Sequence, residues 1–106
     1  IQRLGKDRAM FVGLLEMFIE DNAGVVAQTR ADLARGDSDA AARRMHTLRS
    51  NAGFICALEL MDAAGALEKA IEQGDPGDPG VGAGLDAIEA RITAIVDAAR
   101  ALSSLS

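Results

Sequence analysis

Residues 38–54, SDAAARRMHTLRSNAGF, carry the clearest helical pattern in this chain. Their apolar positions, continued one residue further, alternate between spacings of four and three, the period of one helix face: Ala41, Met45, Leu48, Ala52 and Ile55. Gly36 is suited to end a preceding helix, and Asp37 or Ser38 can cap the next one through its side-chain oxygen. We therefore predict a helix from about Ser38 to Phe54 with one buried face.

Further helices are predicted on both sides of this one, over Asp7–Asp21, Gly24–Arg35, Ala57–Gln73 and Val81–Leu102. The stretch GDPGDPG, residues 74–80, predicts a loop, because Gly and Pro both oppose helix continuation. Alternation of the strand type is absent. The sequence predicts an all-α domain over residues 1–106, an antiparallel up-and-down four-helix bundle. The first helix is either an extra N-terminal segment or one of the four.

Composition narrows the functional classes. The 106 residues suit one domain, and 49% of them are hydrophobic but only 3% aromatic. The net charge of −5 disfavours nucleic acid as a partner, and no apolar run is long enough to cross a membrane. A single Cys excludes an internal disulfide framework and fits a reducing compartment, so we expect a cytoplasmic protein. The single His and single Cys disfavour a structural zinc site, which needs four ligands.

The cysteine and the methionines are expected to be buried, on the basis of their side-chain chemistry alone. Cys56 has no second Cys and no His in its sequence neighbourhood to activate it, so we expect a buried structural thiol. The four methionines are expected to fill the core: Met10, Met17, Met45 and Met61.

His46, the only histidine, follows Met45 and is therefore turned about 100° from the buried stripe. Arg49 follows it by three residues and Ser50 by four, so both are its neighbours on the helix surface. Gly53 lies seven residues on, although Gly is unfavourable within a helix. Most lone histidines on helices have no chemical role, so spacing alone does not decide whether His46 has one.

Arg43, Arg44 and Arg49 form a basic cluster around this position in an otherwise acidic chain. A phosphoryl group on the imidazole would account for the cluster, since guanidinium groups stabilise phosphate through charge-assisted hydrogen bonds. Ser50 and Gly53 would then leave room for the active site of a partner protein.

Residues 46–57, HTLRSNAGFICA, resemble the signature of the histidine-containing phosphotransfer (Hpt) domain family. That signature reads His-x-Leu-Lys-Gly, then small residues, then an aliphatic residue and Gly-Ala. The opening helix, the turn at 35–37 and the helix segment 67–70 are also similar to the family. The resemblance covers nearly the whole chain.

The resemblance implies a phosphorelay module of two-component signalling. His46 would accept a phosphoryl group from an aspartyl-phosphate of a response-regulator receiver domain and pass it to another receiver. Arg49 takes the position of the family's Lys and would stabilise the phosphoryl oxygens, whereas Ser50 and Gly53 would provide steric access. The resemblance implies no cofactor and no ATP site in the chain, with Mg²⁺ on the receiver. Since the chain does not begin with Met, we expect a segment of a longer protein, such as a hybrid sensor kinase.

Three residues depart from the family pattern. Ser50 is bulkier than the usual Gly, Cys56 stands where Gly is usual, and Glu68 falls where some members carry a Gln that orients the histidine. An acid at position 68 would repel a phosphate if it faced the site.

Two alternatives compete with this interpretation. The dimerisation hairpin of a sensor kinase has a similar His motif, but it normally carries an acid directly after the His and a Pro five residues on, where this chain has Thr47 and Asn51. A self-contained bundle of several helices instead favours a monomer. The second alternative is a helical protein-interaction module without chemistry.

Overall fold

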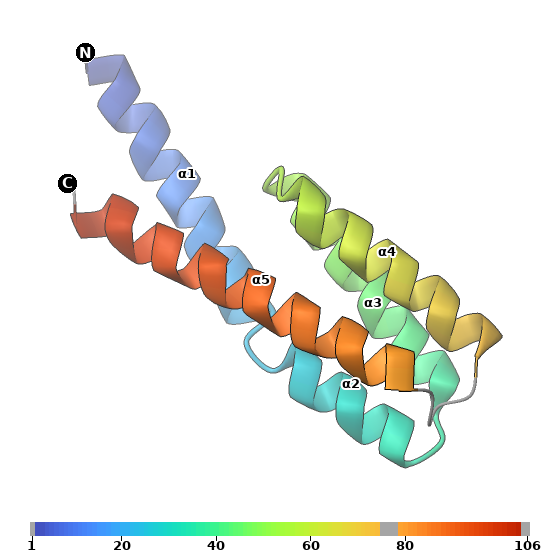
Figure 1. Cartoon of the computed structure of the whole chain (residues 1–106). Helices are drawn as coiled ribbons and strands as arrows, with labels where there is room; N and C mark the ends of the chain where they lie inside the picture. The colour runs from blue at the N-terminus through green and yellow to red at the C-terminus, as the bar shows by residue number, and fades with distance from the viewer. Residues whose placement is uncertain (1, 75–78, 105–106) are drawn as a thin grey trace.

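The computed structural model describes residues 2–74 and 79–104, with side chains described for residues 8–74 and 79–104. Five helices account for nearly all of this part of the chain, with no strand among them (Figure 1): α1 (Gln2–Asp21), α2 (Val25–Ala34), α3 (Ser38–Phe54), α4 (Leu58–Gln73) and α5 (Pro79–Ser104). The predicted all-α class is confirmed. None of these helices is both long and apolar enough to cross a membrane within the described residues.

The helices α2 to α5 alternate in direction and pack in a ring, α2 on α3, α3 on α4, α4 on α5, and α5 back on α2. This is the predicted up-and-down four-helix bundle. The fifth helix, α1, packs on α5 and is the extra N-terminal segment. Figure 1 shows α1 and α5 continuing together beyond the turn between α3 and α4. The molecule is accordingly elongated, with extents of 52 × 18 × 18 Å.

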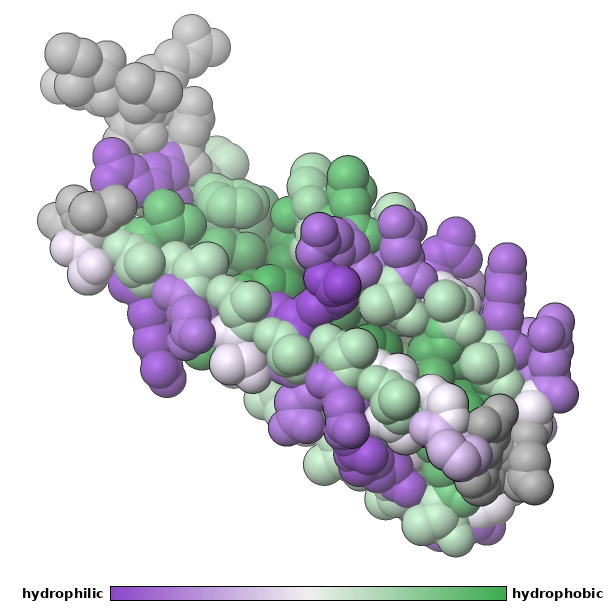
Figure 2. Space-filling view, in the orientation of Figure 1, coloured by the Kyte–Doolittle hydropathy of each residue, from purple (hydrophilic) through white to green (hydrophobic). Residues whose placement is uncertain are grey.

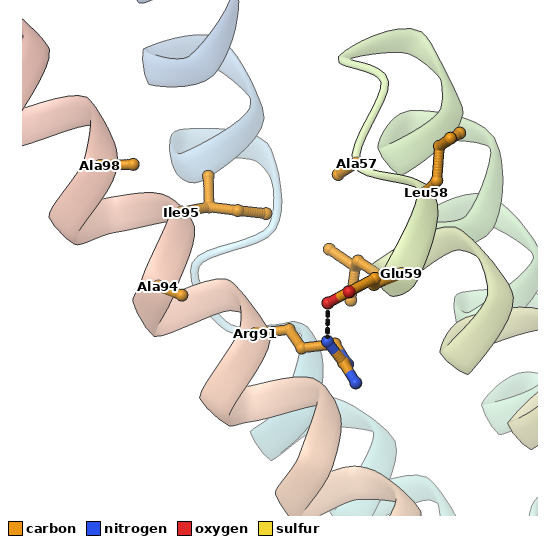
Figure 3. A pocket seen from close by; sticks show the side chains of 8 residues that line it. Ala57, Leu58, Glu59, Arg91, Ala94, Ile95 and Ala98 are labelled. Carbon is orange, nitrogen blue, oxygen red and sulfur yellow. Dashed lines mark hydrogen bonds and ion pairs between the residues drawn. The ribbon is translucent and has the colours of Figure 1, made fainter.

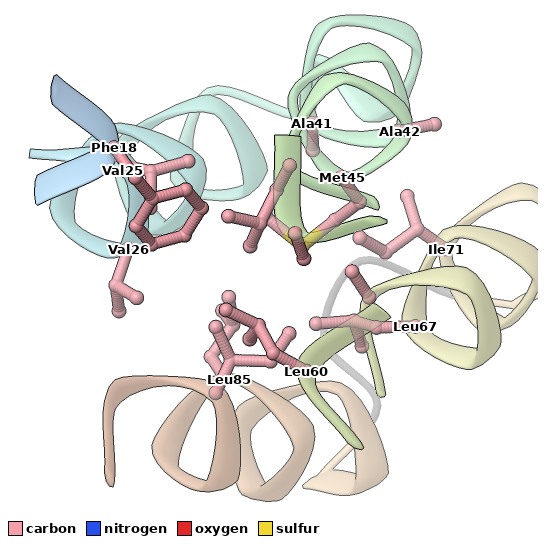
Figure 4. Packing of buried hydrophobic residues seen from close by; sticks show 14 of the residues in the cluster. Phe18, Val25, Val26, Ala41, Ala42, Met45, Leu60, Leu67, Ile71 and Leu85 are labelled. Carbon is pink, nitrogen blue, oxygen red and sulfur yellow. The ribbon is translucent and has the colours of Figure 1, made fainter. Parts of the chain in front are cut away.

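The core lies where the apolar faces of the bundle helices meet (Figure 4). Its largest fully buried apolar side chains are Met45, Leu48, Leu60, Leu85, Ile88 and Val81. Small residues let α3 and α4 approach closely, because Ala52 and Ala64 are also fully buried. The whole predicted stripe of α3 is buried, which leaves the opposite face of α3 to solvent.

The predicted helix ends differ in accuracy. Both ends of α3 are as predicted, and the Asp37 side chain caps it by accepting a hydrogen bond from the Ala40 amide at 3.1 Å. However, α1 begins at Gln2 rather than Asp7, and α5 begins at Pro79 rather than Val81. Pro is well suited to the first turn of a helix, because its missing N–H has no helical partner there. Residues 75–78 of the predicted loop lie outside the described residues.

Two of the four methionines are not in the core, contrary to prediction. Met45 is buried and Met61 is partly buried, but Met10 and Met17 are 67% and 61% exposed. Met10 and Met17 are seven residues apart and therefore share one side of α1, which faces away from its buried residues. Phe11 on α1 is also exposed.

Cys56 is exposed, so its predicted burial is wrong. The reason is the turn after α3, where the Ala57 amide donates to the Ala52 carbonyl at 2.9 Å and the Cys56 amide to Gly53 at 3.0 Å. This hydrogen-bond pair defines a helix C-terminal motif whose central residue is left-handed. Cys56 has φ +59°, and in the equivalent turn after α2 the same place is taken by Gly36 with φ +76°.

An open apolar groove of about 280 Å³ separates the start of α4 from the second half of α5 (Figure 3). Ala57 and Leu58 line one side, and Ala94, Ile95 and Ala98 line the other. An ion pair between Arg91 and Glu59 spans the groove and joins the two helices.

Candidate functional site

His46 lies near the middle of α3, on its solvent side, with 63% of its side chain exposed. Its neighbour Met45 is fully buried, as the 100° rotation between successive helix residues requires. The core therefore fixes the backbone of α3 and leaves the imidazole accessible to a second molecule.

The carboxylate of Glu68, on α4, contacts the imidazole of His46. Its Oε2 atom lies 3.2 Å from Nδ1 of His46, and its side chain is only 17% exposed. A carboxylate at this distance favours a proton on Nδ1, which leaves the lone pair on Nε2. Glu68 thus faces the site. Because it lies on the Nδ1 side of the ring, a phosphoryl group on Nε2 would be held away from it.

Arg49 lies one turn after His46, and the outer part of its side chain, Cδ and Nε, lies against α4 at Gly65. A Cβ atom at Gly65 would come within 3.3 Å of Arg49 Cδ and 3.4 Å of its Nε. Arg49 is exposed and forms no ion pair with any residue that the structure describes. Its charge is therefore available to an anion bound beside His46. Gly65 was not identified from the sequence, although a Gly inside a helix was a signal for close packing.

The predicted cluster of three arginines is only partly present. Arg43 lies on the His46 side, where its Nε approaches the Asp39 carbonyl oxygen at 3.5 Å. Arg44 points the other way, toward α2, and its Nε donates to Asp32 at 2.5 Å. The reason is geometric, because consecutive residues of a helix cannot face the same side. Two arginines, not three, remain near the imidazole.

Asp32, although buried, carries a charge that two arginines compensate. Arg44 and Arg35 both donate hydrogen bonds to its carboxylate, each at 2.5 Å. The hydrogen bond from Arg44 is the main cause that holds the pKa of Asp32 below its ordinary value, against the opposing effect of burial. This cluster joins α2 to α3 and has a structural role.

An open groove of about 450 Å³ adjoins His46 between α3 and α4. Its lining comprises Asp39, Ala42, Arg43, His46, Glu68 and Glu72. Three carboxylates against one arginine make this groove acidic, a feature that the sequence analysis missed because Glu72 and Asp39 lie on different helices. Among residues 8–74 and 79–104, no three His, Cys, Asp or Glu side chains, those of this groove included, are grouped so that they could hold a metal ion.

Ser50 and Gly53 have different surroundings. Ser50 is exposed and lies one turn after His46 on α3. Gly53 instead faces Met61 on α4, and a Cβ atom there would lie 3.2 Å from the Met61 sulfur. The absence of a side chain at Gly53 therefore favours the packing of α3 on α4, and its role in steric access stays a prediction.

In a comparison with protein-family models, residues 13–101 of the 106 match the model described as the Hpt domain. Searches of the curated proteins and of the solved structures gave no match. The matched range contains α2, α3 and α4 completely, together with His46, Arg49 and Glu68.

Proposed function

We propose that this chain, which belongs to the Hpt domain family, carries a phosphoryl group on Nε2 of His46 and exchanges it with receiver domains. The family membership indicates histidine phosphotransfer in two-component signalling. The observation that carries the assignment to a residue is the exposed imidazole of His46 with Glu68 held 3.2 Å from its Nδ1.

The chemistry follows from that contact. The Nε2 lone pair attacks the phosphorus of an aspartyl-phosphate on the receiver, so that the N–P bond forms and the O–P bond of the aspartate breaks. The proton on Nδ1 stays in place throughout, and the ring gains positive charge as the new bond forms. Glu68 stabilises that charge, as a carboxylate beside a catalytic histidine does in other enzymes. The reverse step releases the phosphoryl group to another receiver.

Arg49 has the role of stabilising the transferred group. Its guanidinium is one helix turn from His46 and is free of ion pairs within the described residues. A planar guanidinium can bond two phosphoryl oxygens at once. Ser50 contributes by leaving the approach to the ring open. Arg43, which also lines the groove beside His46, adds positive charge on the same side of α3.

We further propose that Mg²⁺ and the acidic residues that bind it belong to the receiver, and that the chain acts as a cytoplasmic monomer without an ATP site. In this view the chain is a phosphocarrier, and its phosphate comes only from a partner. A sensor-kinase hairpin is less well supported, because a single copy of this chain already forms a complete four-helix ring that includes the His helix α3.

The test is a transfer reaction with purified receiver domains of the source organism, labelled on their aspartates, in the presence of Mg²⁺. We expect acid-labile, base-stable label on the chain and none on His46→Gln. Chelation of Mg²⁺ should stop the transfer. If the folded chain took no label from any receiver, the proposal would be wrong and a helical interaction module would replace it.

A further inference from the structure

Nδ1 is the only atom of the His46 ring that can still gain or lose a proton once a phosphoryl group occupies Nε2. When the N–P bond breaks, its electron pair returns to Nε2. A ring with a proton on Nδ1 then leaves as neutral imidazole, whereas a ring without that proton leaves as imidazolate, a much stronger base and a poorer leaving group. The proton on Nδ1 therefore decides how readily a phosphorylated carrier discharges.

Between two transfers the ring of His46 is open to water. Its side chain is 63% exposed on α3, and Figure 2 shows hydrophilic side chains along the outer edge of the neighbouring helix α4. An exposed ring exchanges its proton with the solvent. The phosphorylated ring consequently keeps a proton on Nδ1 above neutral pH only if a neighbouring negative charge favours it.

The carboxylate of Glu68 is in place to provide that charge. Its Oε2 atom lies 3.2 Å from Nδ1 of His46, and its side chain is only 17% exposed. Buried Leu67 and Ile71, on either side of it in the sequence, fix this part of α4 in the core. No Lys or Arg among residues 8–74 and 79–104 forms an ion pair with Glu68, so its charge acts on the ring.

The other charges near the imidazole are balanced. Among the described side chains, Asp39 and Arg43 of α3 and Glu72 of α4 line the same groove, and Arg49 lies one turn further along α3. Two arginines thus oppose two carboxylates. Glu68, which contacts the ring directly, decides the net effect.

We propose that Glu68 holds the proton on Nδ1 of the phosphorylated ring, so that the carrier discharges at pH values at which a ring without this carboxylate has lost its proton. This inference rests on the proposed function and concerns how pH regulates the same site. In the discharge, a carboxylate oxygen of the receiver aspartate forms the new O–P bond, the N–P bond breaks, and Nδ1 keeps its proton.

Water can replace the aspartate in the same step. The oxygen of water then forms the O–P bond, inorganic phosphate leaves, and one proton of the water goes to the solvent. Glu68 promotes this loss as well, because the leaving group is the same. The chain is accordingly suited to pass a phosphoryl group on quickly and is poorly suited to store it under alkaline conditions.

The first experiment titrates the phosphorylated ring by ¹⁵N NMR. Phosphoramidate, a small phosphodonor that needs no receiver, supplies the phosphoryl group. Glu68→Gln should lower the midpoint pH by about 0.7 units, since unit charges at this separation in a water-like dielectric change the protonated fraction about five-fold. Glu68→Asp keeps the charge, and its midpoint should lie between those of the wild type and Glu68→Gln.

Glu72→Gln is the matched control, because it removes a carboxylate from the same groove one helix turn further along α4. Its midpoint should shift by less than half as much as that of Glu68→Gln. Equal midpoints in the wild type and Glu68→Gln would overturn the inference.

The second experiment measures single-turnover discharge of the phosphorylated chain to one receiver with Mg²⁺, from about pH 6 to about pH 9. Above both midpoints the wild type should discharge about five-fold faster than Glu68→Gln, and below both the rates should converge. Comparison with the same receiver cancels the pH dependence of the receiver. A rate ratio that is constant over this range would indicate a merely structural role and would overturn the inference.

The two proposals fail in different ways. If no receiver exchanged phosphate with the folded wild type, the proposed function would be wrong. Intact transfer with equal midpoints would overturn the role of Glu68 alone. A wild-type chain that took phosphate on His46 from neither phosphoramidate nor any receiver would overturn both.

Discussion

Replacement of Glu68 by Gln removes the negative charge 3.2 Å from Nδ1 of His46 and keeps a side chain of the same size. Two unit charges at that separation interact by about 1 kcal/mol in a water-like dielectric, which is the relevant limit because the imidazole is largely exposed. This interaction helps only when the ring gains charge during phosphoryl transfer. We therefore expect Glu68→Gln to slow the transfer step about five-fold at saturating receiver.

The assay is single-turnover transfer at saturating receiver, combined with ¹⁵N NMR of the imidazole. The wild type should show the tautomer with its proton on Nδ1, and Glu68→Gln should show a larger fraction of the other tautomer. Glu72→Gln is the matched control, because Glu72 lies one turn further along α4 in the same groove. A wild-type rate in Glu68→Gln, or a wild-type ring protonated on Nε2, would refute the reasoning.

Three further predictions concern charge and backbone. Arg49→Ala should reduce the transfer rate at least 10-fold, since a charge-assisted hydrogen bond contributes about 1.5–3 kcal/mol, whereas Arg49→Lys should retain most of the rate. Equal rates in the wild type and both variants would exclude a role for this side chain. Folding lowers the pKa of Asp32, so the ionised carboxylate stabilises the fold fully above the ordinary carboxyl pKa of 3.8, and this stabilisation is lost as the pH falls through the lower folded value. The urea midpoint of Asp32→Asn should therefore vary less between pH 6 and 2 than that of the wild type, and the same pH dependence in both proteins would contradict this. Cys56→Gly should raise the free energy of unfolding by about 1 kcal/mol, because a residue other than Gly is strained in the left-handed conformation, and Gly36→Ala should lower it by a similar amount. A melting temperature of Cys56→Gly that is no higher than that of the wild type would contradict the explanation.

The helix pattern could be predicted from the sequence because it depends on local spacing. The bounds of α3 follow from Asp37 as a cap and from an unbroken apolar stripe. The start of α5 was predicted two residues late, because Gly and Pro were read as loop residues, although Pro is favoured in a first helical turn. The two exposed methionines of α1 were predicted wrongly from residue type; their seven-residue spacing puts them on one side of the helix, and only the packing shows that this side faces solvent.

The site was less predictable because its contacts join residues far apart in the chain. His46 and Arg49 could be identified on one helix, but the direction in which Arg44 turns depends on Asp32 of α2. Glu68 was singled out by resemblance to a family, yet only the fold shows that its carboxylate meets Nδ1. The exposure of Cys56 was missed because a turn geometry, not the chemistry of a thiol, sets its direction.

The close packing of α3 on α4 has an entropic consequence for the reaction. Gly53 and Gly65 lack side chains where the two helices meet. Met61 of α4 lies against Gly53, and Cδ and Nε of Arg49 on α3 lie against Gly65. The carriers of the imidazole and of its carboxylate partner are thereby fixed relative to each other when the protein folds. In the proposed transfer, the orientation of the His46 imidazole would then be established before a receiver arrives, so the encounter would not have to order it again.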